Sequence, residues 1–291
     1  MKQPLPRQWL GREHLAAGHG HWAVAWCSVG GPHHDNQDVA GLCWREPGTH
    51  AGLNVAVADG VTQGAAGAVA AQALVSHWLP GPSTTPSSDH DKVAFLQAAE
   101  PAVARAIAAV TPQTGAATGA ACWLAGDGSG WFTRVGDCRV LHLKYTVQAD
   151  AATEPVQASP WHCVPMLPDQ SLGLLYPDVV AQAAPGSLDP TQPAHMVGCH
   201  RLGEPEWRTL LLAPGDMLLL CSDGLHTMLS HASIEQHVAQ HLDAAKTFNE
   251  VTLQNLCKAL VRSAQAAGGE DDITALLLVY RPNACRPFVA A

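Results

Sequence analysis

Five aspartates in this sequence stand beside short runs of residues that are typical of β-strands. Asp59 follows the apolar run LNVAVA, Asp223 follows MLLLCS, and Asp271 precedes ITALLLVY. Asp137 comes after WFTRVG, and Asp38 comes directly before a short apolar stretch. A carboxylate at the end of an interior strand costs free energy unless it is paired or binds a cation. The pattern therefore indicates that these residues have a chemical role.

Two of the aspartates are each followed by a glycine, Gly60 and Gly224. Glycine lets the backbone turn sharply and bring its carbonyl close to a ligand. Carboxylates and carbonyls are the ligands that Mg²⁺ and Mn²⁺ prefer. A single Asp-Gly pair is most often a simple turn. Because five aspartates fall beside β-like runs, we favour a divalent-cation site over five independent turns.

The elements that must position these residues come in blocks of strands and blocks of helices. We expect strands at 21–28, 39–44, 53–58, 119–124, 130–135, 140–143, 210–212, 217–221 and 273–280, and helices at 65–79, 93–110, 233–242 and 251–267. Blocks that do not alternate strictly favour antiparallel sheets with helices outside them.

The chain is expected to form one domain, since no linker or internal repeat divides it. That domain should span residues 21–282, after a loose lead-in at 1–20 and before a C-terminal tail at 283–291. Residues 146–200 are rich in Pro and Ala and show little periodicity, which predicts an irregular insert. Long connections of this kind are often functional.

The composition excludes several classes of partner. Lys+Arg total 16 and Asp+Glu total 25 among 291 residues, a formal charge of −9 that suits neither nucleic acid nor an anionic membrane surface. The nine cysteines contain no CxxC pair, and several sit within apolar runs, which favours a reducing, cytoplasmic location. The N-terminus lacks the apolar core of a signal peptide, and Pro-Gly-Asp interrupts the longest apolar stretch, at 210–221. We therefore expect no membrane span.

Seven segments of the sequence carry a family resemblance. They are SVGGPHHDNQD (28–38), VAVADGVTQGAAGAVAA (55–71), GAATGAACW (115–123), VGDCRVLHL (135–143), LGEP (202–205), APGDMLLLCSDGL (213–225) and GGEDDITALLLVY (268–280). In this order they resemble the bacterial branch of the PP2C (PPM) family of metal-dependent protein serine/threonine phosphatases, over about residues 22–281. The resemblance implies an α/β fold in which two antiparallel sheets pack face to face and antiparallel helices flank them.

The resemblance also implies a metal-binding role for most of the aspartates. Asp59 would bridge two Mn²⁺ or Mg²⁺ ions, and the carbonyl of Gly60 would bind one of them. Asp223 and Asp271 would hold the other ion. Asp137 matches the residue that in many members helps to hold a third, weaker ion.

Two further positions are expected to serve the reaction, and three places in the sequence depart from the family pattern. Asp38 would orient the attacking water. His33 stands where the family usually has an Arg that binds the substrate phosphate, with His34 beside it. A histidine donates fully to phosphate only when it is protonated, and the alternative is a pair of exposed loop histidines. Thr62-Gln63 replaces a usual glycine pair, and Asp272 replaces a usual Asn. Val61 stands where many eukaryotic members have a His, which bacterial members also lack.

A metal-assisted reaction agrees with the charge of the chain. A phosphate monoester is a dianion that a protein of charge −9 repels, and two cations would neutralise it and lower the pKa of the water between them. Water would then attack directly, without a covalent phosphoenzyme. Consistently, the sequence has neither a Cys-x5-Arg loop nor a GxxxxGK[ST] loop.

We therefore predict a monomeric enzyme that hydrolyses phosphoserine or phosphothreonine in substrates of a serine/threonine kinase. A first alternative is a degenerate family member that binds phosphoproteins or another partner without turnover. The missing Arg favours this alternative, whereas the retained aspartates oppose it. A second alternative is a metallophosphatase of small phosphoesters.

Overall fold

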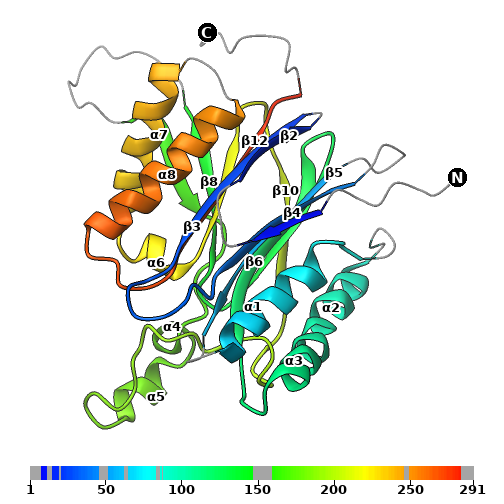
Figure 1. Cartoon of the computed structure of the whole chain (residues 1–291), viewed down its shortest axis with the longest axis vertical. Coiled ribbons are helices and arrows are strands. Elements are labelled where there is room, and N and C mark those ends of the chain that lie inside the picture. Colours follow the sequence, from blue (N-terminus) through cyan, green and yellow to red (C-terminus); the bar gives the residue numbers. More distant parts are fainter. Residues whose placement is uncertain are drawn as a thin grey trace, which may run out of the picture.

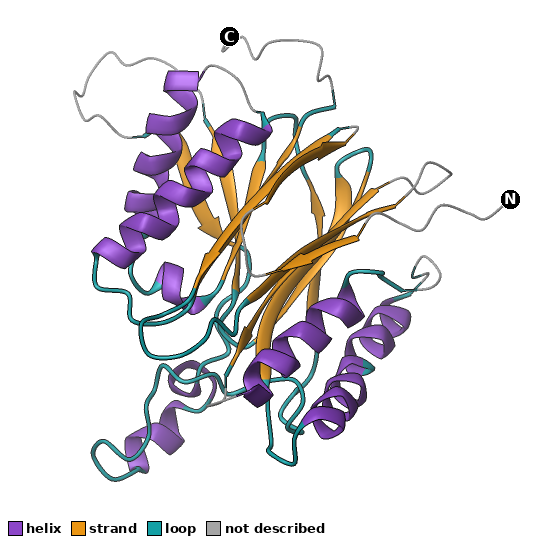
Figure 2. Cartoon of the chain, viewed as in Figure 1, coloured by secondary structure: helices purple, strands orange, loops and turns teal. Residues whose placement is uncertain are grey.

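Two six-stranded antiparallel sheets pack face to face, and helices cover the outer surface of each (Figures 1 and 2). This computed structural model describes residues 8–11, 15–19, 21–45, 52–61, 65–82, 86, 88–146, 159–245 and 249–282. The arrangement confirms the predicted fold class of two antiparallel sheets flanked by helices.

The first sheet has the strand order β1-β4-β5-β6-β7-β10. Its strands are β1 (Gln8–Gly11), β4 (Val39–Arg45), β5 (Gly52–Gly60), β6 (Ala117–Ala125), β7 (Ser129–Val135) and β10 (Glu206–Leu211). The helices on its outer side are α1 (Ala65–Trp78), α2 (Asp89–Gln97) and α3 (Ala99–Val110).

The second sheet has the strand order β2-β3-β12-β11-β8-β9. Its strands are β2 (Leu15–His19), β3 (Trp22–Val29), β12 (Ile273–Tyr280), β11 (Met217–Cys221), β8 (Arg139–Tyr145) and β9 (Trp161–Pro165). Its helices are α6 (Asp223–His226), α7 (His231–Ala245) and α8 (Glu250–Ala266). Two short helices, α4 (Leu172–Leu175) and α5 (Pro177–Gln182), lie beside one end of the sandwich, at the lower left of Figure 1.

The alternation of side chains along each strand builds three apolar layers. In β5, Leu53, Val55 and Val57 pack between the two sheets, whereas Ala56 and Ala58 pack under the helices. Successive strand residues point to opposite faces, so one strand serves two cores. The small alanines of β5 face the alanine-rich side of α1, which lets that helix lie close to the sheet.

The structure corrects three expectations about elements. Residues 8–11 and 15–19, expected within a loose lead-in, form β1 and β2 at the edges of the two sheets. β1 pairs with β4, and β2 pairs with β3. Segments of four or five residues are too short for their sequence pattern to predict such pairing. The expected irregular insert also contains β9, α4 and α5. The expected tail at 283–291 lies outside the described residues.

The single helix expected over 93–110 is two helices, α2 and α3, that meet at Ala98. Pro101 lies in the first turn of α3, and its missing N–H cannot bond to the carbonyl of Gln97, where α2 ends. Within the described residues, Asp89–Val110 is the one helical stretch whose length and composition could cross a membrane. Here Leu96 and Val103 of this stretch pack into the core over the first sheet.

Candidate metal centre

The side-chain rows that face between the two sheets become polar at the same end of the sandwich. The inward-facing row of β5 continues to Asp59, and that of β4 begins at Asp38. In the second sheet, the row of β11 continues to Ser222, and that of β12 begins with Asp272 and Thr274. Antiparallel pairing brings these strand ends together, so residues far apart in sequence meet at one place.

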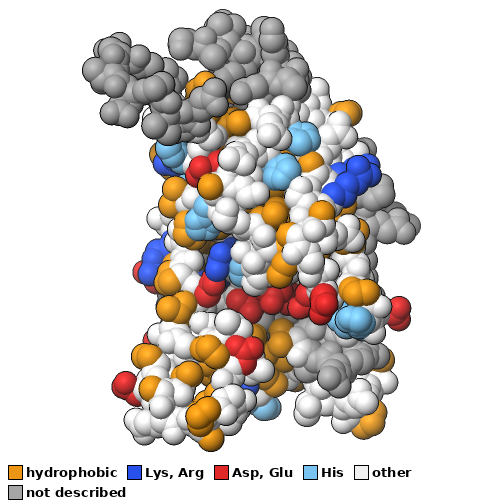
Figure 3. Space-filling view, turned by 90° about the vertical axis from the view of Figure 1, so that its left-hand side faces the viewer, with side chains coloured by type: hydrophobic (Ala, Val, Ile, Leu, Met, Phe, Trp, Pro, Cys, Tyr) orange, Lys and Arg blue, Asp and Glu red, His pale blue; other side chains and the backbone are white. Residues whose placement is uncertain are grey.

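A cavity of about 540 Å³ opens at this end of the sandwich, and we call it the aspartate cavity. Figure 3 shows acidic side chains in a band across this face of the molecule. The lining residues are His33, His34, Gln37, Asp59, Gly60, Val61, Asp137, Pro193, Asp223, Asp271 and Asp272. Among these described residues none is Lys or Arg, so only the two histidines could offer positive charge.

The structure brings together the residues that the sequence singled out, with one distinction. Asp59, Gly60, Asp137, Asp223 and Asp271 all line the aspartate cavity, as does His33 at an exposed position. Asp38 is fully buried and does not belong to the lining.

Two glycines allow the elements around the cavity to approach closely. A Cβ at Gly60 would collide with the backbone of Gly67, where the first turns of α1 pass the end of β5. A Cβ at Gly224 would collide with the carbonyl of Asp272. Glycine therefore brings α6, which begins at Asp223, against the start of β12.

Asp38 lies at the junction of the two sheets. Its Oδ2 accepts a hydrogen bond from Ser222 Oγ at 2.6 Å, and its backbone N–H donates to Asn36 Oδ1 at 2.9 Å. Oδ1 of Asp38 has no hydrogen-bond partner among the described residues. Burial raises the pKa of Asp38 to about 7, although the hydrogen bond from Ser222 opposes that shift.

Asp272 holds the loop that carries the two histidines. Its Oδ1 accepts the N–H of Gly31 at 2.8 Å, and its Oδ2 accepts the N–H of Gln37 at 2.6 Å. The two N–H groups meet different oxygens, and an Asn side chain would present an NH2 group, which accepts no hydrogen bond, to one of them, so Asp suits this position. Asp272 therefore has a structural role as well as adding negative charge.

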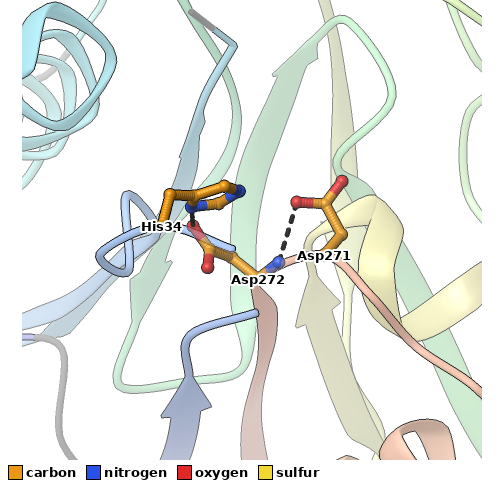
Figure 4. Close-up of side chains that lie close together, drawn as sticks. All are labelled: His34, Asp271 and Asp272. Carbon is orange, nitrogen blue, oxygen red and sulfur yellow. Dashed lines mark hydrogen bonds and ion pairs between the residues drawn. The ribbon is translucent and has the colours of Figure 1, made fainter. Parts of the chain in front are cut away.

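His34, Asp271 and Asp272 line the cavity, and Figure 4 shows that their side chains lie close together. His34 Nδ1 is 3.7 Å from Asp272 Oδ2, and Asp271 Oδ1 accepts the N–H of Asp272 at 2.8 Å. The hydrogen bond with the Asp35 carbonyl raises the pKa of His34, and the charges of Asp272 and Asp271 add to that effect. Ligand atoms of His34, Asp271 and Asp272 all lie within 4.8 Å of one another.

The carboxylates of the cavity are poorly neutralised by the protein. Burial, followed by repulsion from neighbouring aspartates, raises the pKa of Asp59 and of Asp223 well above the ordinary value. Burial raises the pKa of Asp137 to about 6. Like Asp38, Asp137 and Asp223 each have a buried Oδ1 without a hydrogen-bond partner among the described residues. Unpaired carboxylate oxygens beside a backbone carbonyl fit hard divalent cations.

Several supporting residues were missed at the level of sequence. Ser28 Oγ and Thr274 Oγ1 are 2.7 Å apart, and Asn36 Nδ2 donates to Ser28 Oγ at 2.9 Å. Thr274 N–H donates to Ser222 Oγ at 3.0 Å, which extends the network to Asp38. Their signal was the period-two alternation, because Ser28, Ser222 and Thr274 stand on the inward-facing rows of their strands.

His226 was also not predicted from the sequence, although it follows Asp223 by three residues on α6. Its Nε2 donates to the backbone carbonyl of Asp137 at 2.9 Å. Burial lowers the pKa of His226 to about 4, so its ring is neutral at pH 7. The ring therefore supports the Asp137 turn without adding positive charge to the cavity.

Two comparisons of the sequence with known proteins match parts of this chain. The family model described as stage II sporulation protein E (SpoIIE) matches residues 176–281. The protein phosphatase PhpP of Streptococcus pneumoniae is 37% identical over 75 residues, which cover 26% of this chain and 27% of that relative. The matched segment thus spans about a quarter of that relative's length.

Solved structures match over most of the chain. The serine/threonine phosphatase of S. agalactiae has a TM-score of 0.64 at 22% identity and covers 89% of this chain and 100% of its own. The catalytic domain of serine threonine protein phosphatase PstP in complex with 2 manganese ions has a TM-score of 0.62 at 20% identity, over 89% of this chain and 98% of its own. Serine-threonine phosphatase 2C from Toxoplasma gondii has a TM-score of 0.68 at 16% identity, over 95% of this chain and 100% of its own. These likenesses establish a shared fold.

Proposed function

We propose that this chain is a metal-dependent protein serine/threonine phosphatase of the PP2C type. The observation that carries the proposal is the aspartate cavity, which is lined by Asp59, Asp137, Asp223, Asp271 and Asp272. Two of these, Asp137 and Asp223, and the adjacent Asp38 each have a buried carboxylate oxygen without a hydrogen-bond partner among the described residues. A solved structure of the same fold contains two manganese ions, which supports a divalent cation in the reaction.

The cavity residues can be assigned roles. Asp59 and the Gly60 carbonyl would hold one Mn²⁺ or Mg²⁺ ion. Asp59, Asp223 and Asp271 would hold a second ion, and Asp137 would help to hold a third. When bound, such ions neutralise a phosphate dianion and lower the pKa of a coordinated water. Their binding also removes the repulsion among the carboxylates of the cavity.

Asp38 and the histidines would serve the substrate and the water. Ser222 donates to Oδ2 of Asp38, and Oδ1 has no partner among the described residues, so Oδ1 would orient the attacking water and accept its proton. His33 and His34 would donate hydrogen bonds to phosphate oxygens when protonated. The two hydrogen bonds to Asp272 keep their loop at the cavity rim.

The surface beside the cavity favours a protein substrate over a small phosphoester. Of the nine large hydrophobic side chains exposed in the described part of the chain, five lie on α4, α5 and the loop after them: Leu174, Leu175, Tyr176, Val179 and Leu188. Pro193, at the end of the same segment, lines the cavity. Exposed apolar surface next to a site is typical of a protein-binding surface. We further propose that the substrates come from a serine/threonine kinase and that the protein acts as a cytoplasmic monomer.

The competing function is phosphoprotein binding without turnover, which the lack of Lys and Arg among the described lining residues favours. A phosphothreonine peptide and p-nitrophenyl phosphate should be compared at equal Mn²⁺, with and without EDTA. We expect Mn²⁺-dependent phosphate release, with a higher kcat/KM for the peptide. Peptide binding without release would establish the degenerate alternative, and a preference for p-nitrophenyl phosphate would establish the small-phosphoester alternative.

A further inference from the structure

The turn that carries Asp137 is fastened to the start of the segment that includes α4 and α5. The N–H of Gly136 donates to Gln170 Oε1 at 2.9 Å, and the N–H of Gln170 donates to the Gly136 carbonyl at 2.9 Å. Gln170 therefore accepts a hydrogen bond from Gly136 through its side chain and donates one back to Gly136, the residue before Asp137, through its backbone N–H. These bonds link positions 34 residues apart in the sequence.

The C-terminal side of the same turn is held by Asp169, the residue before Gln170. Arg139 Nε donates to Asp169 Oδ1 at 2.9 Å, and Arg139 Nη2 donates to Asp169 Oδ2 at 2.6 Å. A bidentate guanidinium–carboxylate pair fixes orientation as well as distance. We call Asp169 and Gln170 the anchor pair. Asp137 therefore lies between two attachment points that both belong to the anchor pair.

Gln170 is itself held in a closed network. It is 2% exposed, and its Nε2 donates to Glu206 Oε1 at 3.3 Å. Glu206 Oε2 lies 3.9 Å from Nη2 of the buried Arg134, whose Nη1 donates to the Gly136 carbonyl at 3.1 Å. The Gln170 carbonyl accepts the N–H of Ala194 at 2.7 Å. A buried amide that uses its donor and acceptor groups in this way has little freedom to move.

We propose that Gln170 is a positioning residue that holds the Asp137 carboxylate in place for the ion assigned to it. This inference rests on the proposed function, because it concerns the weakest of the cations. Asp137 Oδ1 is buried and has no hydrogen-bond partner among the described residues, so the contacts to its turn help to set where that oxygen lies. Residues that orient metal ligands commonly change metal affinity by about 10–100-fold when they are removed.

The test is Mn²⁺ binding to the full chain, measured by titration calorimetry without substrate. Gln170→Leu removes the side-chain bonds at similar volume and should weaken the weakest Mn²⁺ site by about 10–100-fold, with tighter sites unchanged. Asp137→Asn identifies that site by weakening the same step. Gln182→Leu is the matched control, because Gln182 is exposed at the end of α5. It should leave every Mn²⁺ affinity unchanged.

Two variants that exchange charge between positions 170 and 206 distinguish a positioning role of Gln170 from a general effect on stability. Gln170→Glu keeps the acceptor for Gly136 but faces Glu206 with a like charge, so it should also weaken the weakest site. Adding Glu206→Gln restores a donor and an acceptor between the two positions and should recover the affinity. Thermal melts measure stability separately, and this pair of variants decides the matter if Gln170→Leu does not fold.

Unchanged affinity of the weakest site in folded Gln170→Leu, or in Gln170→Glu, would overturn the inference. So would an equal loss at all Mn²⁺ sites, which indicates only a loosened fold. Phosphatase activity is not the readout here, so a failure of the proposed function would appear separately, as a wild-type protein that binds Mn²⁺ but releases no phosphate.

Discussion

Asp59 stands where the inward-facing row of β5 reaches the aspartate cavity, and its carboxylate is the one assigned to both principal ions. Asp59→Asn should lower kcat by orders of magnitude while the fold persists, because no apolar packing is lost. In metal-free protein the same change should raise Tm, since it removes a buried negative charge that neighbouring aspartates repel. Steady-state kinetics and melts in EDTA check both effects.

Asp127→Asn is the matched control for that change, because Asp127 is exposed in the turn between β6 and β7. Its kcat should equal that of the wild type. Near-normal Mn²⁺-dependent turnover in Asp59→Asn would contradict the assignment of the site.

His33 is the residue on which phosphate affinity is expected to depend. An Arg offers a permanent charge and a planar set of donors matched to phosphate oxygens, whereas a neutral imidazole offers one donor. His33→Arg should therefore lower KM for a phosphopeptide, and His33→Ala should raise it, with smaller changes in kcat. Exposed His90 of α2 provides the control, His90→Arg. If neither change at His33 moves KM, the phosphate is held by other groups.

At the scale of elements, the site depends on a hydrogen bond that joins the two sheets. Ser222 follows β11 of the second sheet and donates to Asp38, which precedes β4 of the first. Ser222→Ala should lower stability by about 1–3 kcal/mol, because it leaves a buried carboxylate oxygen unpaired. It should also raise the pKa of Asp38 further, since that hydrogen bond lowers it. If Asp38 must be ionised for turnover, the acidic limb of the pH–rate profile should move to higher pH.

Exposed Ser187 allows a control, Ser187→Ala, which should leave both stability and the pH–rate profile unchanged. An unshifted acidic limb in a folded Ser222→Ala protein would mean that Asp38 does not govern that limb.

Strand ends explain why much of the site was accessible from the sequence. Runs such as LNVAVAD and DDITALLLVY show both the strand and the side-chain alternation that sends Asp59 and Asp272 inward. The split of α2 from α3 depends on one proline, and β1 and β2 depend on backbone partners far along the chain. The anchor pair could not be predicted, because nothing in the types of Asp169 and Gln170 indicates contact with a turn some 30 residues earlier.

For the whole molecule, the cavity makes stability depend on pH and on metal. The pKa of Asp38 is raised to about 7 and that of Asp137 to about 6, so the folded state binds these protons more tightly than the unfolded chain. That contribution to stability is fully present below the ordinary Asp pKa, near 4, and is lost as pH rises to about 7. Without metal, the free energy of unfolding should fall across this window.

Mn²⁺ should reverse this loss at neutral pH. At 100 times its Kd, an ion that binds only the folded state adds about 2.7 kcal/mol of stability. The gain should be larger at pH 7.5 than at pH 5.5, because protons compete for the same carboxylates at the lower pH. Melts at both pH values, with Mn²⁺ and with EDTA, measure it. A Tm in EDTA that does not fall between those pH values would contradict the electrostatic account of the cavity.

The central claim is that the aspartate cavity binds divalent cations that are required for phosphate release. Its most direct test is one Mn²⁺ titration of chelated protein, in which bound Mn²⁺ is counted by electron paramagnetic resonance and phosphate release from a phosphothreonine peptide is measured at each point. We expect no release without Mn²⁺ and release that rises as the second ion binds. Release in EDTA, or full Mn²⁺ occupancy without release, would contradict the account.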